Sequence, residues 1–322
     1  MAADRKIVVI ANPHSQGGGL GRRWGEIERL LRRELGGFEV QKTKAPRDAV
    51  RLCREALADG ADVVCALGGD GTVHEVTNGF FDDDGQPLRP DGSAALAVLP
   101  YGTGGDFRKT AGVSKDLAEA ARLVRDGAPR PIDVGWLEYR AGGKDGPPGQ
   151  SAFVNIASFG IGGLVDQLVN RSSKALGGTI SFFLATARAA ISYRNQPVEL
   201  VFDDQDDQAV SVTINNVAVA NGRYFGGGMF IAPRAELDDG LFDVVTVGDI
   251  GPGEMLLSGR HLYAGTHLDL PKISSRRCKK LHARPGPGST EILLDVDGEP
   301  LGALPATFTV KQNALSLVAP KA

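Results

Sequence analysis

This 322-residue sequence has little cysteine, no long apolar run and no excess of basic over acidic residues. The formal net charge is -3, which excludes broad nucleic-acid binding driven by overall basicity. The three cysteines, Cys53, Cys65 and Cys278, lack the spacing of metal ligands, and the first two fall within an expected helix and strand, which favours buried thiols. No apolar stretch approaches the roughly 20 residues that span a bilayer.

The N-terminal residues lead directly into an apolar strand without the pattern of a signal peptide. We therefore expect a cytoplasmic protein without a transmembrane segment, whose contact with membranes is peripheral. The length makes two domains the default, and the sequence leaves a homodimer open.

Several familiar motifs are also missing. There is no G-x-x-x-x-G-K-[ST] sequence, which excludes a P-loop. The glycines from Gly17 to Gly21 lack G-x-G-x-x-G spacing, and no acid follows the second expected strand, so a dinucleotide Rossmann site is disfavoured. No H-E-x-x-H, G-x-S-x-G or protein-kinase set occurs. A nucleotide would need a different glycine-rich cradle.

The first part of the chain alternates between apolar runs and helical patterns. Strands are expected at 7–11, 38–43, 63–67 and 95–99, and helices at 24–35, 46–57 and 114–125. Ser114 is the expected cap of the last helix, and residues 15–21 form a glycine-rich loop. This alternation predicts an α/β nucleotide-binding domain over residues 1–131 with a mainly parallel sheet.

The second part has strand-like runs separated by turns. The runs are 132–137, 153–157, 198–202, 210–220, 241–247, 292–296 and 306–310. A helical pattern over 179–193, with Phe182 and Phe183, is the main exception; it fits a core helix best, and a lipid-pocket wall is the alternative. We expect a mostly antiparallel β-sandwich domain over residues 132–304, with a segment from about 305 to 322 that could pack back on the first domain.

One stretch organises the chain, from Gly68 to Glu75. An apolar strand runs into three glycines within four residues, and a helical pattern follows. Thr72 and Glu75 have capping-box spacing. A strand, a glycine turn and a helix N-terminus form an anion site, in which Asp70 fits if a metal ion bridges it to a phosphate or if it accepts a proton. A turn whose aspartate only caps the helix is the alternative.

Two further glycine-rich segments, 12–21 and 102–106, also follow expected strands. Because the carboxyl ends of parallel strands meet at one edge of a sheet, we expect the three segments to converge there.

These residues carry a resemblance. Residues 68–76 have the sequence GGDGTVHEV, which resembles the GGDGT-x-N-E-V signature of the diacylglycerol kinase catalytic family, including bacterial soluble lipid kinases and the sphingosine and ceramide kinases. Residues 99–107 resemble its L-P-x-G-T-x-N-D-F block, and residues 12–17 its N-P-x-S-G loop. Further matching blocks lie at 220–235, 237–243 and 297–299.

The resemblance implies an ATP- and Mg²⁺-dependent lipid kinase with its active site in the cleft between two domains, diacylglycerol being the leading substrate and phosphatidic acid the product. The acceptor would be a lipid at a membrane surface. Asp70 would accept the proton of the lipid hydroxyl or hold water and metal beside it, and Glu299 is the second candidate for the base. The nucleotide-binding residues implied are Asn12, Ser15, Gly68, Gly69, Gly71, Thr72, Glu75, Thr103 and Asp106.

The resemblance also implies roles for two other acids. Asp133 matches an acid that supports the active site. Asp239, with main-chain oxygens of Glu236 and Leu241, resembles a structural magnesium site of the bacterial members, and a plain hairpin turn is the equal alternative.

The chain departs from the family pattern at two positions. Gly105 replaces the usual Asn beside Asp106, which removes a side-chain hydrogen-bonding group, and His74 replaces the usual Asn before Glu75, as in sphingosine-kinase-type members. The rivals are a kinase for another acceptor (a sphingoid or ceramide lipid, phosphatidylglycerol or NAD) and a catalytically silent lipid-binding regulator. The basic run from Arg276 to Arg284 fits a solvated surface or a patch for anionic headgroups.

Overall fold

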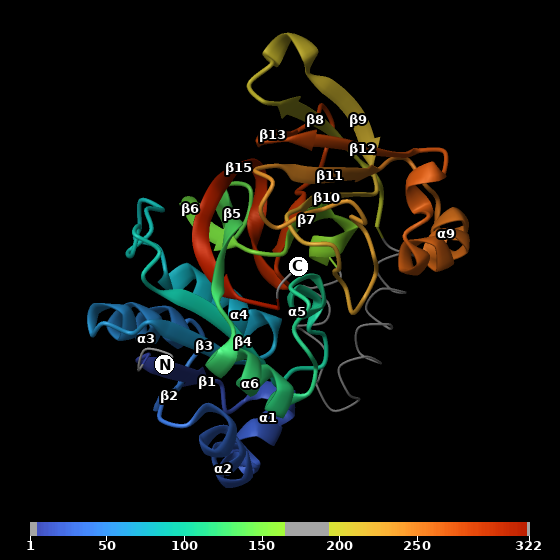
Figure 1. Ribbon diagram of the computed structural model, residues 1–322. Helices are drawn as coiled ribbons and strands as arrows, with labels where there is room; N and C mark the ends of the chain where they lie inside the picture. The colour runs from blue at the N-terminus through green and yellow to red at the C-terminus, as the bar shows by residue number, and fades with distance from the viewer. Residues whose placement is uncertain (1–4, 165–192, 321–322) are drawn as a thin grey trace. The chain divides into compact units, whose positions relative to one another are not determined.

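A computed structural model describes residues 5–164 and 193–320 (Figure 1). The helix expected over 179–193 therefore lies outside the described residues, apart from Tyr193. The chain divides into two compact units, one reaching to Val134 and resuming at Gln312, the other running from Gly135 to Lys311. The chain passes from one unit to the other within strands β5 (Pro129–Ala141) and β15 (Glu299–Val318).

The first unit is an α/β domain with a parallel sheet, as expected. The strands are β1 (Ile7–Ala11), β2 (Glu39–Lys42), β3 (Val63–Gly68) and β4 (Ala95–Pro100). Their order is β4-β3-β1-β2, and every pair is parallel. The end of β15 adds a further parallel partner for β4, through Ser316 and Leu317. β1 and β3 are buried at every position, which explains why their sequences are continuously apolar.

The helices of this unit cover both faces of the sheet (Figure 1). They are α1 (Ser15–Arg22), α2 (Trp24–Leu35), α3 (Asp48–Ala58), α4 (Asp70–Gly79), α5 (Asp106–Thr110) and α6 (Leu117–Asp126). α3 packs against α4, and α2 packs against α6. The pairing of α3 with α4 follows from right-handed crossovers, because the strand order reverses direction after β2 and then continues the same way to β4.

Two local expectations in this unit are wrong. The glycine-rich segment is not all loop: after positive φ angles at Gln16, Gly17 and Gly18, the chain turns into the end of α1. The cap of α6 is Asp116 rather than Ser114, since the Asp116 carboxylate accepts a hydrogen bond from the Glu119 N–H at 2.9 Å. The Ser114 hydroxyl instead donates to the Glu119 carboxylate at 2.6 Å.

The second unit is the expected β-sandwich. One row of strands is β12-β11-β10-β7-β14, and the other contains β9, β8, β13, β15, β5 and β6. Aromatic pairs join strands of the two rows: Phe159 of β7 stacks on Phe308 of β15, and Phe153 of β6 stacks on Phe242 of β11. The bounds are β6 (Pro148–Phe153), β7 (Ile156–Gly160), β8 (Gln196–Phe202), β9 (Val210–Ile214), β10 (Asn216–Ala220), β11 (Phe242–Val247), β12 (Ile273–Cys278), β13 (Lys280–Pro285) and β14 (Leu293–Val296).

Two expected strands of this unit are each divided in two. The run 153–157 contains the end of β6 and the start of β7, and the run 210–220 contains β9 and β10 with a break at Asn215. The helix α9 (Pro252–Ala264) and the strands β12 and β13 were not expected. None of the helices in the described part of the chain is both long and apolar enough to traverse a bilayer.

All three cysteines are buried and unoxidised, which confirms the expectation for Cys53 and Cys65. Burial raises the pKa of the Cys65 and Cys278 thiols to about 12, so these thiols stay protonated and unreactive.

Candidate functional site

The three glycine-containing segments of the first unit meet at one edge of its sheet, as expected. Asn12 follows β1, Gly68 ends β3, and Tyr101 follows β4, and these three parallel strands are neighbours. The Asn12 N–H donates to the Leu67 carbonyl at 3.1 Å, and the Tyr101 N–H donates to the Gly68 carbonyl at 2.8 Å. The end of β3 is therefore the centre of the site.

The absence of a side chain at residue 68 leaves room for hydroxyl groups. A Cβ there would lie 2.3 Å from Oγ1 of Thr72 and 3.1 Å from Oγ of Ser15. The Asn12 side-chain amide donates to Oγ1 of Thr72 at 3.3 Å. Asn12, Ser15, Gly68 and Thr72, all expected at the nucleotide, are thus brought together.

The main chain of Gly102 lies close to the main chain of Gly69, next to this cluster. A Cβ on Gly102 would lie 2.6 Å from Cα of Gly69, so only glycine fits at residue 102. Gly69 is the N-cap of α4, and Gly71 lies in the first turn of that helix. Thr103, in the same loop as Gly102, is exposed. The site therefore offers hydroxyls, glycine main chain and a helix N-terminus, which suit an anion such as a phosphate.

Asp70 is the first residue of α4, and the 104–105 segment fixes its carboxylate. The Gly105 N–H donates to Oδ2 of Asp70 at 2.7 Å. A Cβ on Gly104 would lie 2.8 Å from the same oxygen. Gly105 has φ 68° and ψ 43°, a left-handed conformation that aims its N–H at Asp70. The sequence did not predict this hydrogen bond, although a glycine where the family usually has Asn is consistent with a positive φ at residue 105.

Two acids expected at the nucleotide bond other groups of the protein. Glu75 accepts hydrogen bonds from the main-chain N–H groups of Arg47 and Ala49, at 2.9 and 3.1 Å, and so caps α3. The capping box with Thr72 is wrong, because Thr72 lies inside α4 and Glu75 bonds the start of α3, the preceding helix. Asp106 is buried and bonded to the Lys109 ammonium at 2.8 Å.

Asp133 is fully buried, and the Asn313 N–H donates to its Oδ1 at 2.8 Å. Within the first unit this contact ties the start of β5 to the returning part of β15. Asp133 thus has a structural partner close to the point at which the chain leaves the unit.

Glu299 begins β15 in the second unit, opposite Val296 of β14. The two residues between them, Asp297 and Gly298, both have positive φ angles, as in a tight Asp-Gly hairpin turn. The buried Asp297 carboxylate accepts hydrogen bonds from the N–H groups of three consecutive residues, 154–156, at 3.0–3.1 Å. The connection between β6 and β7 therefore holds the turn that presents Glu299. In the sequence, Asp297 is only part of a block that matches the family. The Asp-Gly pair could have indicated the hairpin turn.

The Asp239 turn does not fit the expected metal. The Leu241 N–H donates to Oδ1 of Asp239 at 3.0 Å, and the Arg277 guanidinium bonds Oδ2. Glu236 is exposed. Both carboxylate oxygens of Asp239 thus have protein donors, and a metal ion there would lie beside a guanidinium. Among residues 5–164 and 193–320, no group of three or more His, Cys, Asp or Glu could hold a metal ion.

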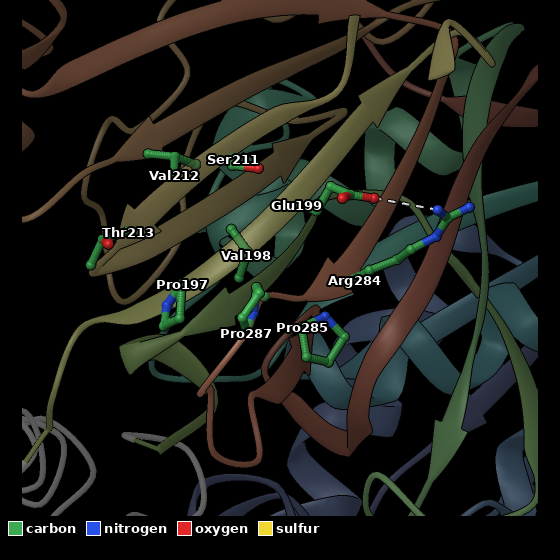
Figure 2. Close-up of a pocket in the computed structure, with 10 residues that line it drawn as sticks. Pro197, Val198, Glu199, Ser211, Val212, Thr213, Arg284, Pro285 and Pro287 are labelled. Atoms are coloured by element: carbon green, nitrogen blue, oxygen red, sulfur yellow. Dashed lines mark hydrogen bonds and ion pairs between the residues drawn. The ribbon is translucent and has the colours of Figure 1, made fainter. Parts of the chain in front are cut away.

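Several side chains of the basic run have partners within the second unit. Arg276 lies over the Phe202 ring at 4.3 Å, and Lys280 pairs with Asp204 at 3.0 Å. Arg284 pairs with Glu199 at 3.3 Å at the rim of an open cavity of about 620 Å³. Figure 2 shows this pair beside Pro285, in a cavity that also has Pro197 and Val198 in its lining. The cavity contains none of the expected site residues.

The comparisons with known proteins agree with this fold. Residues 6–137 match the model of the diacylglycerol kinase catalytic domain. Residues 155–319 match the model of the YegS C-terminal NAD kinase beta sandwich-like domain.

Three individual proteins give the scale of the similarity. A diacylglycerol kinase of Mycobacterium tuberculosis is 28% identical over 319 residues, which cover 98% of this chain and 96% of that protein. A Pseudomonas putida protein named a probable YegS-like lipid kinase is 30% identical over 88% of this chain and 85% of its own. A solved structure from Bacillus anthracis str. Sterne, provisionally named a diacylglycerol kinase, has a TM-score of 0.76 and 26% identity, covering 99% of both chains.

A parallel α/β unit with glycine-rich loops, joined to a β-sandwich, defines a kinase of the NAD-kinase and lipid-kinase architecture. Within that class, the chain belongs to the diacylglycerol kinase and YegS-like lipid kinase family.

Proposed function

We propose that this protein transfers the γ-phosphate of ATP to the hydroxyl of diacylglycerol, with Mg²⁺, to give ADP and phosphatidic acid. The observation that carries the proposal is the Asp70 carboxylate, held by the Gly105 N–H at the N-terminus of α4 and beside the glycine cradle of β3. A lipid kinase of this family needs both a phosphate site and a carboxylate next to it, and the cradle and Asp70 of the first unit support both roles.

The cradle would hold the phosphates. The Ser15 and Thr72 hydroxyls and the Asn12 amide are suitable partners for phosphate oxygens, and they lie around the space that a Cβ at residue 68 would fill. Gly69, Gly71 and Thr103 would bring main chain close to the nucleotide. Glu75 and Asp106 would contribute less to this binding, because their carboxylates already bond the start of α3 and Lys109.

Asp70 would act on the acceptor. As the lipid hydroxyl oxygen forms its bond to the γ-phosphorus, the bond from that phosphorus to the β–γ bridging oxygen breaks, and the hydroxyl proton passes to the Asp70 carboxylate. The transfer depends mainly on positioning and on charge stabilisation. Glu299 is the second candidate for the proton acceptor, presented on its own hairpin by Asp297.

Magnesium, when bound, would neutralise charge on the transferring phosphates. The oxygen donors of the cradle and the Asp70 carboxylate fit this hard cation, because Mg²⁺ is usually held by one or two carboxylates together with substrate phosphates. The acceptor would be reached at a membrane surface through peripheral contact.

The test is incubation of the whole protein with labelled ATP, Mg²⁺ and separate vesicles that contain diacylglycerol, ceramide, sphingosine or phosphatidylglycerol, with an NAD reaction alongside. We expect label mainly in phosphatidic acid. Label in another lipid would replace diacylglycerol as the substrate, label in NAD alone would exclude the lipid kinase, and no label at all would indicate a silent regulator.

Asp70→Asn is the first variant to make. Asparagine retains an oxygen that can accept the Gly105 N–H but is not a base, so we expect the rate to fall by roughly 10²–10⁴-fold with an unchanged melting temperature. Glu299→Gln is the matched variant. Near-normal turnover of Asp70→Asn together with a large loss in Glu299→Gln would transfer the role of base to Glu299.

A further inference from the structure

An arginine lies where the family resemblance implies a metal ion. Arg277 is on β12, directly opposite Asp243 on the neighbouring strand β11. Its guanidinium bonds Oδ2 of Asp239, in the turn before β11, and its Nε lies 3.5 Å from Oδ2 of Asp243. One side chain therefore bridges the turn and the strand that follows it.

Arg277 brings positive charge to both carboxylates, and Arg234 adds a second favourable charge near Asp243. The Asp243 side chain is only 5% exposed and that of Asp239 is 19% exposed, so water screens their repulsion poorly. The Leu241 N–H satisfies the other oxygen of Asp239 but brings no net charge. Arg276, the preceding residue, lies over the Phe202 ring instead, since successive side chains of a strand point to opposite faces.

We infer that Arg277 takes the place of a divalent cation at the Asp239 turn, so that this chain holds the turn without a metal. A planar guanidinium can bond two carboxylates at once, as the contacts to Asp239 and Asp243 require. It is also covalently attached, so the stability of the turn would not depend on the Mg²⁺ concentration. The inference concerns the second unit and does not rest on the proposed reaction.

Thermal melting tests this in the absence of nucleotide, with a chelator and then with an excess of Mg²⁺ or Ca²⁺. The whole wild-type protein should melt at the same temperature in both media and should contain no metal after chelation and gel filtration. Arg277→Gln should melt roughly 5 °C lower with the chelator, because it leaves two acids close together, and should recover at least half of that loss with the metal. Arg277→Lys, which keeps the charge, should stay insensitive to metal.

Arg276→Gln is the matched control, since it removes the adjacent charge that does not face the acids, and its melting temperature should not respond to metal. About one ion per wild-type chain, lost in Asp239→Asn, would overturn the inference, as would an Arg277→Gln melting temperature that is equal in the two media. If Arg277→Gln folds only with metal, the inference is supported. If it folds in neither medium, Arg277→Lys decides: insensitivity to metal supports the inference, and a melting temperature that rises with Mg²⁺ overturns it.

Discussion

Residue 105 is where this chain departs from its family at the site, and the structure gives the position a main-chain role. Its N–H donates a hydrogen bond to the Asp70 carboxylate, and its φ of 68° directs the N–H toward that carboxylate. Asparagine adopts this conformation more readily than other non-glycine residues, whereas a β-branched residue is strained there. A Cβ at residue 105 would lie 2.9 Å from Nε of Arg108, and this flexible side chain can move aside.

We therefore expect Gly105→Asn to keep kcat within about threefold and Gly105→Val to lower it by roughly tenfold or more, because a small displacement of a catalytic group is costly. Steady-state kinetics with the best lipid acceptor measures both. Gly112→Val is the matched control: Gly112 also has a positive φ, 72°, but does not bond Asp70, so it should lose stability without the loss in kcat. Equal kcat values for Gly105→Val and Gly105→Asn would show that this N–H does not position Asp70.

Helix α4 contributes residues both to the candidate site and to the packing of α3. Its N-terminus carries Asp70 and Thr72, while Glu75, one turn on, caps α3. A motif match cannot separate these functions, because both residues belong to one signature. The structure separates them by where each carboxylate points.

The cap on α3 gives a prediction about stability. Glu75→Gln should lower the free energy of unfolding by about 1–2 kcal/mol, since one of the two N–H groups loses its acceptor and the helix N-terminus loses a negative charge. We expect a melting temperature lower by a few degrees and a KM for ATP that changes by less than about twofold. Thr72→Val should do the opposite, raising KM with little change in melting. A large KM effect of Glu75→Gln at unchanged stability would return Glu75 to the nucleotide site.

At the scale of the whole molecule, the sequence predicted those features that depend on local patterns. Continuous apolar runs predicted β1 and β3, and glycines after parallel strands predicted that the loops would meet. The break between β6 and β7 was missed because its cause lies far away in sequence: residues 154 and 155 leave the ladder, and their N–H groups bond Asp297. The same limit applies to Arg277, whose partners are visible only once β11 and β12 are paired.

Charge is the property of the whole molecule that the sequence most easily misrepresents. The run from Arg276 to Arg284 resembles a headgroup patch, yet Lys280 and Arg284 are paired with Asp204 and Glu199, and the net charge of the chain is -3. Unpaired near-surface charges attract anionic lipid with about 1 kcal/mol each, a factor of about five in binding.

We therefore expect Lys280→Gln and Arg284→Gln each to change binding to anionic vesicles by less than about twofold, because removing either cation also frees an acid whose attraction it had cancelled. Co-sedimentation at low salt measures this, where any surface electrostatic effect is largest. Lys115→Gln, which removes an exposed charge outside the run, is the control. A roughly fivefold loss for either variant of the run, and not for the control, would mean that the pairs open at the lipid surface and that the run docks the enzyme after all.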